Sequence, residues 1–385
     1  MSKLNVSNLF NENEDGAPVV SGISTFSSPN YFVPPSGTTA QRPSSPGEGM
    51  IRFNTDSGHL EYYTGTHWAD VIVNNNELGN HLVTNSAGGT GHRGLIAGGY
   101  SPASPSIVNT IDYISISTLG NSQDFGDMNG LTRLAGSCAS STRGLFGGGA
   151  SPAPTKTNKI DVVTIASTGD ASDFGNLTVT RNQLSGCSNS TRGLFGAGDG
   201  PSAISDVIDY VTIASNGDAQ DFGDLLAAAE QVASCSNSIR GLWGSGHTGA
   251  FSNVIQYITI STTGNAQDFG DLITARNIAG SCSSSTRGLW GGGSTPILLN
   301  VIEFVTIASK GNAQDFGNLT SARKAGQAAC SSPTRGIFAG GEDPSGLSNV
   351  IDFVTIASTG NASDFGDLQG PTTQNCACSN GHGGL

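Results

Sequence analysis

Positive charge is scarce in this chain of 385 residues: 17 Lys and Arg stand against 30 Asp and Glu, giving a formal net charge of −13. A groove for nucleic acid needs clustered cations, and attraction to an anionic membrane surface needs a basic patch. The sequence also lacks any apolar run of about 18 residues, the length that a membrane-spanning helix requires. We therefore expect no nucleic-acid partner and no membrane insertion.

Histidine is also rare, and its six copies share no common spacing: His59, His67, His81, His92, His247 and His382. No CxxC pair occurs, so neither residue type supplies the ligand spacing of a metal site. No Ser/His/Asp or paired-carboxylate arrangement is recognisable either. We therefore expect no cofactor, no metal and no catalytic residue, and we interpret the protein as a non-enzyme.

The cysteines follow one regular spacing instead of a disulfide framework. Six of the seven lie five residues before the start of a recurring Arg-Gly-Leu-type motif, whose last, degenerate copy begins at Gly383: Cys138, Cys187, Cys235, Cys282, Cys330 and Cys378. Equivalent sites in neighbouring units should lie farther apart than the roughly 4.4–6.8 Å between Cα atoms that a disulfide needs. We expect buried free thiols near an axis, in a chain that folds in a reducing cytoplasm. A ring of metal-binding thiolates is the alternative, and it lacks histidines in register.

Two motifs recur through most of the sequence with a period of 47 to 50 residues. An Arg-Gly-Leu/Ile signature starts at Arg93, Arg143, Arg192, Arg240, Arg287 and Arg335. Asp-Phe-Gly starts at Asp124, Asp173, Asp221, Asp268, Asp315 and Asp364. Such a period predicts stacked supersecondary units, and a period near 50 residues is typical of a propeller blade.

Each repeat reads as four strands. A short Arg-Gly-Leu strand ends in glycines, and a longer strand rich in β-branched and aromatic residues follows, as at 208–213. The third strand carries Asp-Phe-Gly, and a fourth strand of small residues carries the cysteine. β-Branched and aromatic residues favour a pleated surface. We therefore predict an all-β fold, a six-bladed β-propeller.

The small-residue strand is displaced relative to the other three. Gly88 stands where the first cysteine should be, whereas 373–379 forms a spare copy near the C-terminus. Pairing this spare strand with the first Arg-Gly-Leu strand would complete a blade from both chain ends and remove an open edge. In the competing layout, 83–89 supplies the first inner strand.

The recurring Arg and Asp are expected to form charge-assisted pairs within or between blades. A catalytic site should break the repeat symmetry, because chemistry needs one site rather than six. Three residues break it: Glu230, Gln256 and His247. They are single substitutions and are not expected to converge.

The N-terminal quarter differs in composition from the repeats. Residues 1–48 are rich in Ser, Pro, Asn and Gly and predict an extended arm that orders on a partner, with a flexible tail as the alternative. Residues 49–72 predict a small β meander, 73–92 a linker, and 93–385 the propeller. The meander is too small to stand alone, so its aromatic residues should pack on the propeller or on another copy of the chain, as in a homo-oligomer.

The segments after the Arg-Gly-Leu strands vary while everything around them repeats. They should emerge together at one face, as tips presented by a rigid scaffold. The candidate binding residues on this face are Tyr100, Phe251, Ile297, Leu298, Leu299 and Asp343. Tolerated drift in solvent-exposed loops is the competing explanation.

The repeats resemble those of the kelch family of β-propellers. The resemblance rests on doubled glycines after an apolar strand, at 98–99, 148–149 and 340–341, and on an Arg before the small-residue strand: Arg133, Arg181, Arg276 and Arg323. The Tyr and Trp pair of that family is matched only loosely. Because kelch propellers serve both enzymes and binding proteins, the resemblance implies a fold and not a function.

A second resemblance is to virion proteins of tailed phages, particularly cyanobacterial myophages. It rests on the opening residues 1–9, on the block at 31–72 and on the appended repeats. It implies a structural protein of the virion, made in the host cytoplasm and resembling a tail fibre or spike. Residues 1–72 would bind other virion proteins, and the propeller face would bind a host-surface glycan or protein, or another virion protein. A capsid decoration or vertex protein is one alternative, and a glycan-processing propeller enzyme is another.

Overall fold

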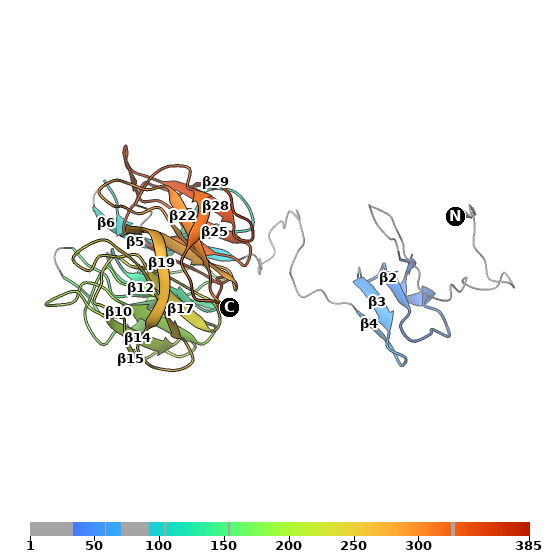
Figure 1. The fold of residues 1–385 in the computed structure, drawn as a ribbon. Helices are drawn as coiled ribbons and strands as arrows, with labels where there is room; N and C mark the ends of the chain where they lie inside the picture. The colour runs from blue at the N-terminus through green and yellow to red at the C-terminus, as the bar shows by residue number, and fades with distance from the viewer. Residues whose placement is uncertain (1–33, 58, 71–91, 104, 153–154, 325–327) are drawn as a thin grey trace. The chain divides into compact units, whose positions relative to one another are not determined.

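The computed structural model describes residues 34–57, 59–70, 92–103, 105–152, 155–324 and 328–385. The chain divides into two compact units, Met1–Leu82 and Val83–Leu385. In the described residues of both units the regular structure is β-strand, apart from one short 3-10 helix (Figure 1). Among the residues that the structure describes, no helix is long and apolar enough to span a membrane. The predicted all-β class is confirmed.

The first unit contains a four-stranded sheet in the order β1-β2-β3-β4. Its elements are β1 (Ser36–Gly37), η1 (Thr39–Gln41), β2 (Ile51–Asn54), β3 (His59–Tyr63) and β4 (Trp68–Asp70). Within the described residues, the meander predicted for 49–72 corresponds to β2, β3 and β4. Strand β1 pairs in parallel with β2, so this sheet also includes residues from the predicted arm.

The part of the second unit that the structure describes contains six four-stranded antiparallel sheets, each of which runs from an inner to an outer strand. In that order, the first comprises β30 (Cys376–Ser379), β5 (Arg93–Tyr100), β6 (Ile107–Ser115) and β7 (Gln123–Asp127). The second comprises β8 (Gly136–Ala139), β9 (Arg143–Gly147), β10 (Lys159–Thr164) and β11 (Ser172–Asn176). The third comprises β12 (Ser185–Ser188), β13 (Arg192–Gly196), β14 (Val207–Thr212) and β15 (Gln220–Asp224).

The remaining three sheets follow the same plan. The fourth comprises β16 (Ala233–Ser236), β17 (Arg240–Gly244), β18 (Ser252–Thr259) and β19 (Gln267–Arg276). The fifth comprises β20 (Gly280–Ser283), β21 (Arg287–Gly291), β22 (Val301–Thr306) and β23 (Gln314–Asn318). The sixth comprises β24 (Ala329–Ser331), β25 (Arg335–Ala339), β28 (Val350–Thr355) and β29 (Ser363–Asp367). A small hairpin, β26 (Glu342–Asp343) and β27 (Gly346–Leu347), lies between β25 and β28.

The first sheet combines strands from both ends of the second unit. β30 pairs with β5, with Cys376 opposite Ala97 and Ser379 opposite Gly94. The predicted pairing of the C-terminal strand with the first Arg-Gly-Leu strand is therefore present. The competing segment, 83–89, lies outside the described residues. Since β30 occupies the position beside β5, the first sheet already has its inner strand.

Contacts between neighbouring sheets depend on small residues at fixed positions. Six inner-strand cysteines, one from each sheet, place their Sγ against the Arg-Gly-Leu glycine of the next sheet, so closely that a Cβ on that glycine would lie 2.5 to 3.0 Å from the sulfur. The six pairs are Cys138–Gly193, Cys187–Gly241, Cys235–Gly288, Cys282–Gly336, Cys330–Gly94 and Cys378–Gly144. The fifth pair joins the sixth sheet to the first, so every sheet contacts two others in one cycle.

The Arg-Gly-Leu arginines connect the same neighbours. Each donates from Nη1 to the main-chain carbonyl of an Ile in the next sheet: Arg93 to Ile165, Arg143 to Ile213, Arg192 to Ile260, Arg240 to Ile307, Arg287 to Ile356 and Arg335 to Ile116. The expected pairing of these arginines with the Asp-Phe-Gly aspartates is therefore wrong. A carbonyl of the neighbouring sheet accepts instead, because it lies within reach of the guanidinium.

Buried charge pairs do occur, but they join a different arginine to the long strand. Arg181 pairs with Asp209, Arg276 with Glu303 and Arg323 with Asp352, and all six side chains are fully buried. In the fourth sheet both members of the pair have changed. Ala229 lies at the arginine position and Gln256 at the carboxylate position, where its Oε1 accepts from the main-chain N of Leu226. The fourth sheet therefore lacks both the cation and the carboxylate of this buried pair.

Candidate functional site

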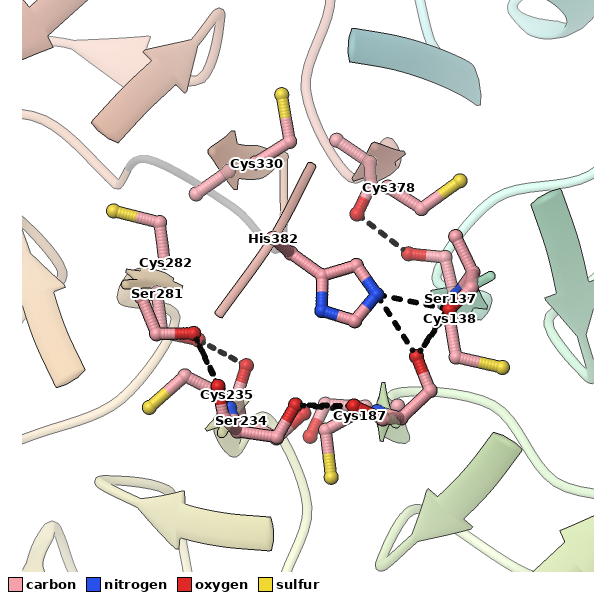
Figure 2. A pocket seen from close by; sticks show the side chains of 18 of the residues that line it. Ser137, Cys138, Cys187, Ser234, Cys235, Ser281, Cys282, Cys330, Cys378 and His382 are labelled. Carbon is pink, nitrogen blue, oxygen red and sulfur yellow. Dashed lines mark hydrogen bonds between the residues drawn. The ribbon is translucent and has the colours of Figure 1, made fainter. Parts of the chain in front are cut away.

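The six inner strands surround a narrow axial cavity of about 60 Å³ (Figure 2). Each inner strand contacts the inner strands of two neighbouring sheets. Figure 2 shows the cysteine sulfurs pointing outward from this cavity, toward the sheets. All seven cysteines are buried and free, and burial raises the pKa of the Cys330 thiol to about 12. These thiols are packing groups and are poor ligands, because metals bind the thiolate.

A belt of serines joins the inner strands near one end of the cavity. Five hydroxyls each donate to a carbonyl of the preceding inner strand at 2.6 to 2.8 Å: those of Ser188, Ser236, Ser283, Ser331 and Ser379. The sixth position is Ala139, which has no hydroxyl to donate. The belt is therefore open at one point, between β30 and β8.

His382 lies beside that point, with its ring inside the cavity (Figure 2). Its Nε2 donates to the carbonyl oxygen of Ala139 at 2.8 Å, and its Nδ1 accepts from the main-chain N of Gly384 at 3.1 Å. A carbonyl can only accept and an amide N–H can only donate, so these partners fix one neutral tautomer. Burial lowers the pKa of His382. The C-terminal residues thus plug this end of the cavity, which we call the plug end.

The opposite end, which we call the loop end, has a belt of unusual backbone conformations. Five residues at equivalent positions adopt positive φ angles of 52 to 61°: Leu134, Gln183, Gln231, Ile278 and Gln374. Main-chain hydrogen bonds link them in series, from Leu134 N to Gln374 O, Gln183 N to Leu134 O, Gln231 N to Gln183 O and Ile278 N to Gln231 O. Left-handed conformations are costly for such side chains and concentrate at functional or over-determined sites.

The variable segments surround this loop end. Each Arg-Gly-Leu strand runs antiparallel to the inner strand beside it. The variable segment that follows an Arg-Gly-Leu strand therefore starts at the end of the sheet where the inner strand begins. Isolated β-bridges join the residues that precede the inner strands to the residues that follow the Arg-Gly-Leu motifs: Arg133 with Ala150, Asn182 with Asp199, Glu230 with His247, Asn277 with Ser294, Lys324 with Glu342 and Thr373 with Tyr100. These bridges also define which residues of the different repeats are equivalent. Glu230 occupies the position of Asn182 in its repeat, and not the position of Arg181.

A chain of amide hydrogen bonds crosses the loop end and finishes at a carboxylate. Asn277 donates to Gln231, Gln231 to Gln183, and Gln183 Nε2 to Glu230 Oε2 at 3.1 Å. Every donor in this series points toward Glu230, so each bond polarises the next in the same direction. Desolvation raises the pKa of Glu230, and the nearby carboxylate of Asp199 raises it further.

Glu230 and His247 converge, contrary to the expectation from the sequence. Oε1 of Glu230 lies 3.8 Å from Nδ1 of His247. The His247 ring meets Phe251 edge-on, with centroids 6.1 Å apart. Phe251, a predicted binding residue, is 38% exposed. Two symmetry-breaking residues and one candidate residue therefore form a single cluster. It arises because a main-chain bridge holds Glu230 opposite His247.

The other predicted binding residues lie in separate segments of the loop end. Ile297 is 69% exposed, whereas Leu298 and Leu299 are half-buried, because main-chain bonds fold this segment back onto the sheet. Tyr100 is half-buried at the end of β5, bridged to Thr373. Asp343 accepts from the N and hydroxyl of Ser345, and these bonds lower its pKa. Asp343 is thus engaged within its own hairpin.

The loop end brings charged, aromatic and amide side chains close together. Asp199, whose negative charge raises the pKa of Glu230, forms an ion pair with Lys156 at 2.7 Å. Among the described residues, no group of three or more His, Cys, Asp or Glu side chains could hold a metal ion. What the loop end offers is exposed apolar side chains beside carboxylates, an imidazole and several amides. Such a mixture suits a complementary surface.

No family model and no curated protein matches this chain.

Proposed function

We propose that the six sheets are the blades of a closed, six-bladed, kelch-like β-propeller, and that the protein is a non-enzymatic structural component of a phage virion. The cyclic Cys–Gly contacts support closure, because they include the step from the sixth sheet to the first. The similarity of residues 31–72 to tailed-phage virion proteins supports the location. In this proposal the protein resembles a tail fibre or spike, held to other virion proteins through residues 1–72.

The loop end is the proposed contact surface, for a host surface or another virion protein. One observation carries this assignment: the core repeats almost identically, whereas the differences between repeats gather at the loop end. Phe251 and Ile297 are exposed there, and Phe251 contacts His247 in the cluster that breaks the symmetry. The plug end is filled by the chain's own C-terminal residues. A rigid scaffold with variable tips is a common design for recognition.

Binding of the labelled full-length chain to host cells, and to particles lacking the protein, tests this surface. The double variant Phe251→Ala/Ile297→Ala should bind at least about tenfold more weakly, as expected for losing central apolar contacts. Ile239→Ala is the matched control, since Ile239 is 62% exposed but precedes β17 at the plug end. Equal loss in both variants, or no loss in the double variant, would refute the assignment.

Localisation by electron microscopy of intact particles separates the two structural alternatives. A tail-fibre or spike protein should be found on the tail, and a decoration or vertex protein on the head. Absence from both would refute the virion proposal itself.

The glycan-processing alternative now has one observation in its favour, the contact between Glu230 and His247. Glycoside hydrolysis usually needs a second carboxylate across the scissile bond, and Asp199 is already engaged with Lys156. We expect no turnover on a panel of host-derived glycans. Turnover that Glu230→Gln abolishes would establish the enzyme instead.

A further inference from the structure

The small sheet of the first unit has its charged side chains inside and its apolar side chains outside. Along β2 the buried residues are Arg52 and Asn54, whereas Ile51 is 54% exposed and Phe53 is also exposed. On β3, Glu61 is fully buried and Tyr62 is 40% exposed. In an ordinary half-buried strand the pattern is the reverse.

The buried face is already complete. Glu61 accepts from Arg52 Nη1 at 3.1 Å, from Asn54 at 3.1 Å and from Arg42 Nη2 at 2.5 Å. Both guanidinium groups lie 5.9 Å from the centre of the Trp68 ring. The hydrogen bonds from Arg42 and Asn54 lower the pKa of Glu61. This face needs no further partner, because its buried carboxylate has its cations and its donors.

The opposite face, formed by Ile51, Phe53, Leu60 and Tyr62, is what we call the apolar face. No charged side chain lies among these four. Cross-strand pairing places Ile51 beside Tyr62 and Phe53 beside Leu60. Aliphatic and aromatic side chains therefore alternate in a two-by-two checkerboard.

This checkerboard is complementary to itself. When a second copy is stacked face to face and related by a two-fold axis parallel to the strands, Ile51 meets Tyr62 of the other copy. Phe53 then meets Leu60 in the same way, so that each aromatic ring covers an aliphatic side chain. Alternation of large and small residues across facing positions is what allows layers to interdigitate. An isologous contact between two copies needs this kind of self-complementary patch.

We propose that the apolar face is a dimerisation surface, occupied by the same face of a second copy of this chain. Two stacked sheets make the two-layer arrangement that gives a small sheet an apolar core. The face spans only two strands, β2 and β3, at about 4.8 Å spacing, and a few residues of each strand at about 3.4 Å per residue. It is therefore smaller than the roughly 800 Å² per partner of a standard interface. The dimer is accordingly weak and depends on protein concentration.

Sedimentation equilibrium of the full-length chain tests this inference. We expect a monomer–dimer equilibrium with a dissociation constant in the micromolar range or weaker. Ile51→Thr/Phe53→Thr should weaken it at least about tenfold, while circular dichroism stays unchanged because both side chains are exposed. Leu119→Thr is the control, as Leu119 is exposed but belongs to the second unit. A monomer at all concentrations, or a dimer insensitive to the double variant, would overturn the proposal.

Cross-linking gives a second readout that does not depend on folding energetics. Tyr62→Cys places a thiol on the apolar face of a protein whose own cysteines are all buried. A short bis-maleimide should link two copies of this variant, and should not link copies of Leu119→Cys. Failure of Tyr62→Cys to link at concentrations where the protein is dimeric would assign the dimer to another surface and refute the inference.

Discussion

The Sγ of Cys138 lies so close to Gly193 that a Cβ on this glycine would be 2.5 Å from the sulfur. Cys138 belongs to the second sheet and Gly193 to the third, and the same contact recurs around all six sheets. This relationship explains why a cysteine and an Arg-Gly-Leu glycine recur together in every repeat. The thiol fills the space that the glycine's missing side chain leaves. Neither residue can be replaced by a larger one without moving the neighbouring sheet.

Gly193→Ala should therefore destabilise the protein through overpacking, by about 1–3 kcal/mol. Cys138→Ala removes the sulfur and leaves a small cavity, at a cost of about 1 kcal/mol. In the double variant the new methyl enters that space, so the loss should be smaller than the sum of the single losses. Urea unfolding followed by the fluorescence of buried Trp243 and Trp290 measures all three.

Gly130→Ala is the control for this cycle, because no atom lies within 4 Å of the added Cβ. Its stability should stay within about 0.5 kcal/mol of the parent. Additive losses in the double variant would contradict the packing relationship between Cys138 and Gly193.

In the fourth sheet, Ala229 and Gln256 stand where other sheets have a buried arginine and carboxylate. The equivalent pair, Arg276 and Glu303, provides a second test. Arg276→Ala leaves the carboxylate of Glu303 buried without its cation, which typically costs about 3–5 kcal/mol. Arg276→Ala/Glu303→Gln reproduces the arrangement of Ala229 and Gln256, in which an amide oxygen accepts the main-chain bond. We expect the double variant to be more stable than Arg276→Ala alone. A double variant that is less stable would show that the natural exchange is not compensating.

Acid should destabilise the plug end through His382. Burial lowers the pKa of this residue below its ordinary value of 6.5, so the unfolded state binds the proton first as the pH falls. Its contribution to stability is therefore complete above about pH 6.5, and declines below that value until the folded state is also protonated. Protonation would also place a hydrogen between Nδ1 and the Gly384 N–H.

The free energy of unfolding, measured between pH 8 and pH 5, checks this effect against His382→Asn. The variant cannot titrate at this position, and other groups contribute equally to both proteins. The parent should lose more stability than the variant on acidification. Parallel pH profiles for the two proteins would refute the assignment.

Much of the fold could be predicted from the sequence because one unit is repeated six times. The strands at 208–213 and at each Asp-Phe-Gly follow from β-branched and aromatic patterns that the other copies reinforce. The pairing of β30 with β5 could be predicted from a counting argument, since one inner strand was missing at the start and one was spare at the end.

The candidate site could be predicted only in part, because its residues depend on register and on contacts between sheets. Arg133 and Arg181 look equivalent in the sequence, yet they lie one position apart in the repeat. Arg181 reaches a buried carboxylate, whereas Arg133 lies at the loop end, beside Gln374. For the same reason, the contact between Glu230 and His247 could not be predicted: Glu230 lies one position further along the repeat than its alignment with Arg181 suggests. His382 carried no signal at all, because its role arises from the missing hydroxyl at Ala139.

Thiol reactivity provides a simple check on the cysteine positions. All seven cysteines are free and buried, so a thiol reagent should titrate none in the native protein and seven after denaturation. Two or fewer thiols in the denatured protein would mean that disulfides have formed. Rapid reaction in the native state would mean that the inner strands open readily.

Deletion of residues 372–385 tests most directly the central claim, that the six sheets close into a ring through β30. This deletion removes the strand that pairs with β5 and the cysteine that packs on Gly144. Deletion of 381–385 is the control, because it removes the plug and keeps β30. We predict that the longer deletion lowers the melting temperature far more than the shorter one and broadens the transition. If the protein lacking 372–385 melts like the full-length chain, the ring is not closed by this strand.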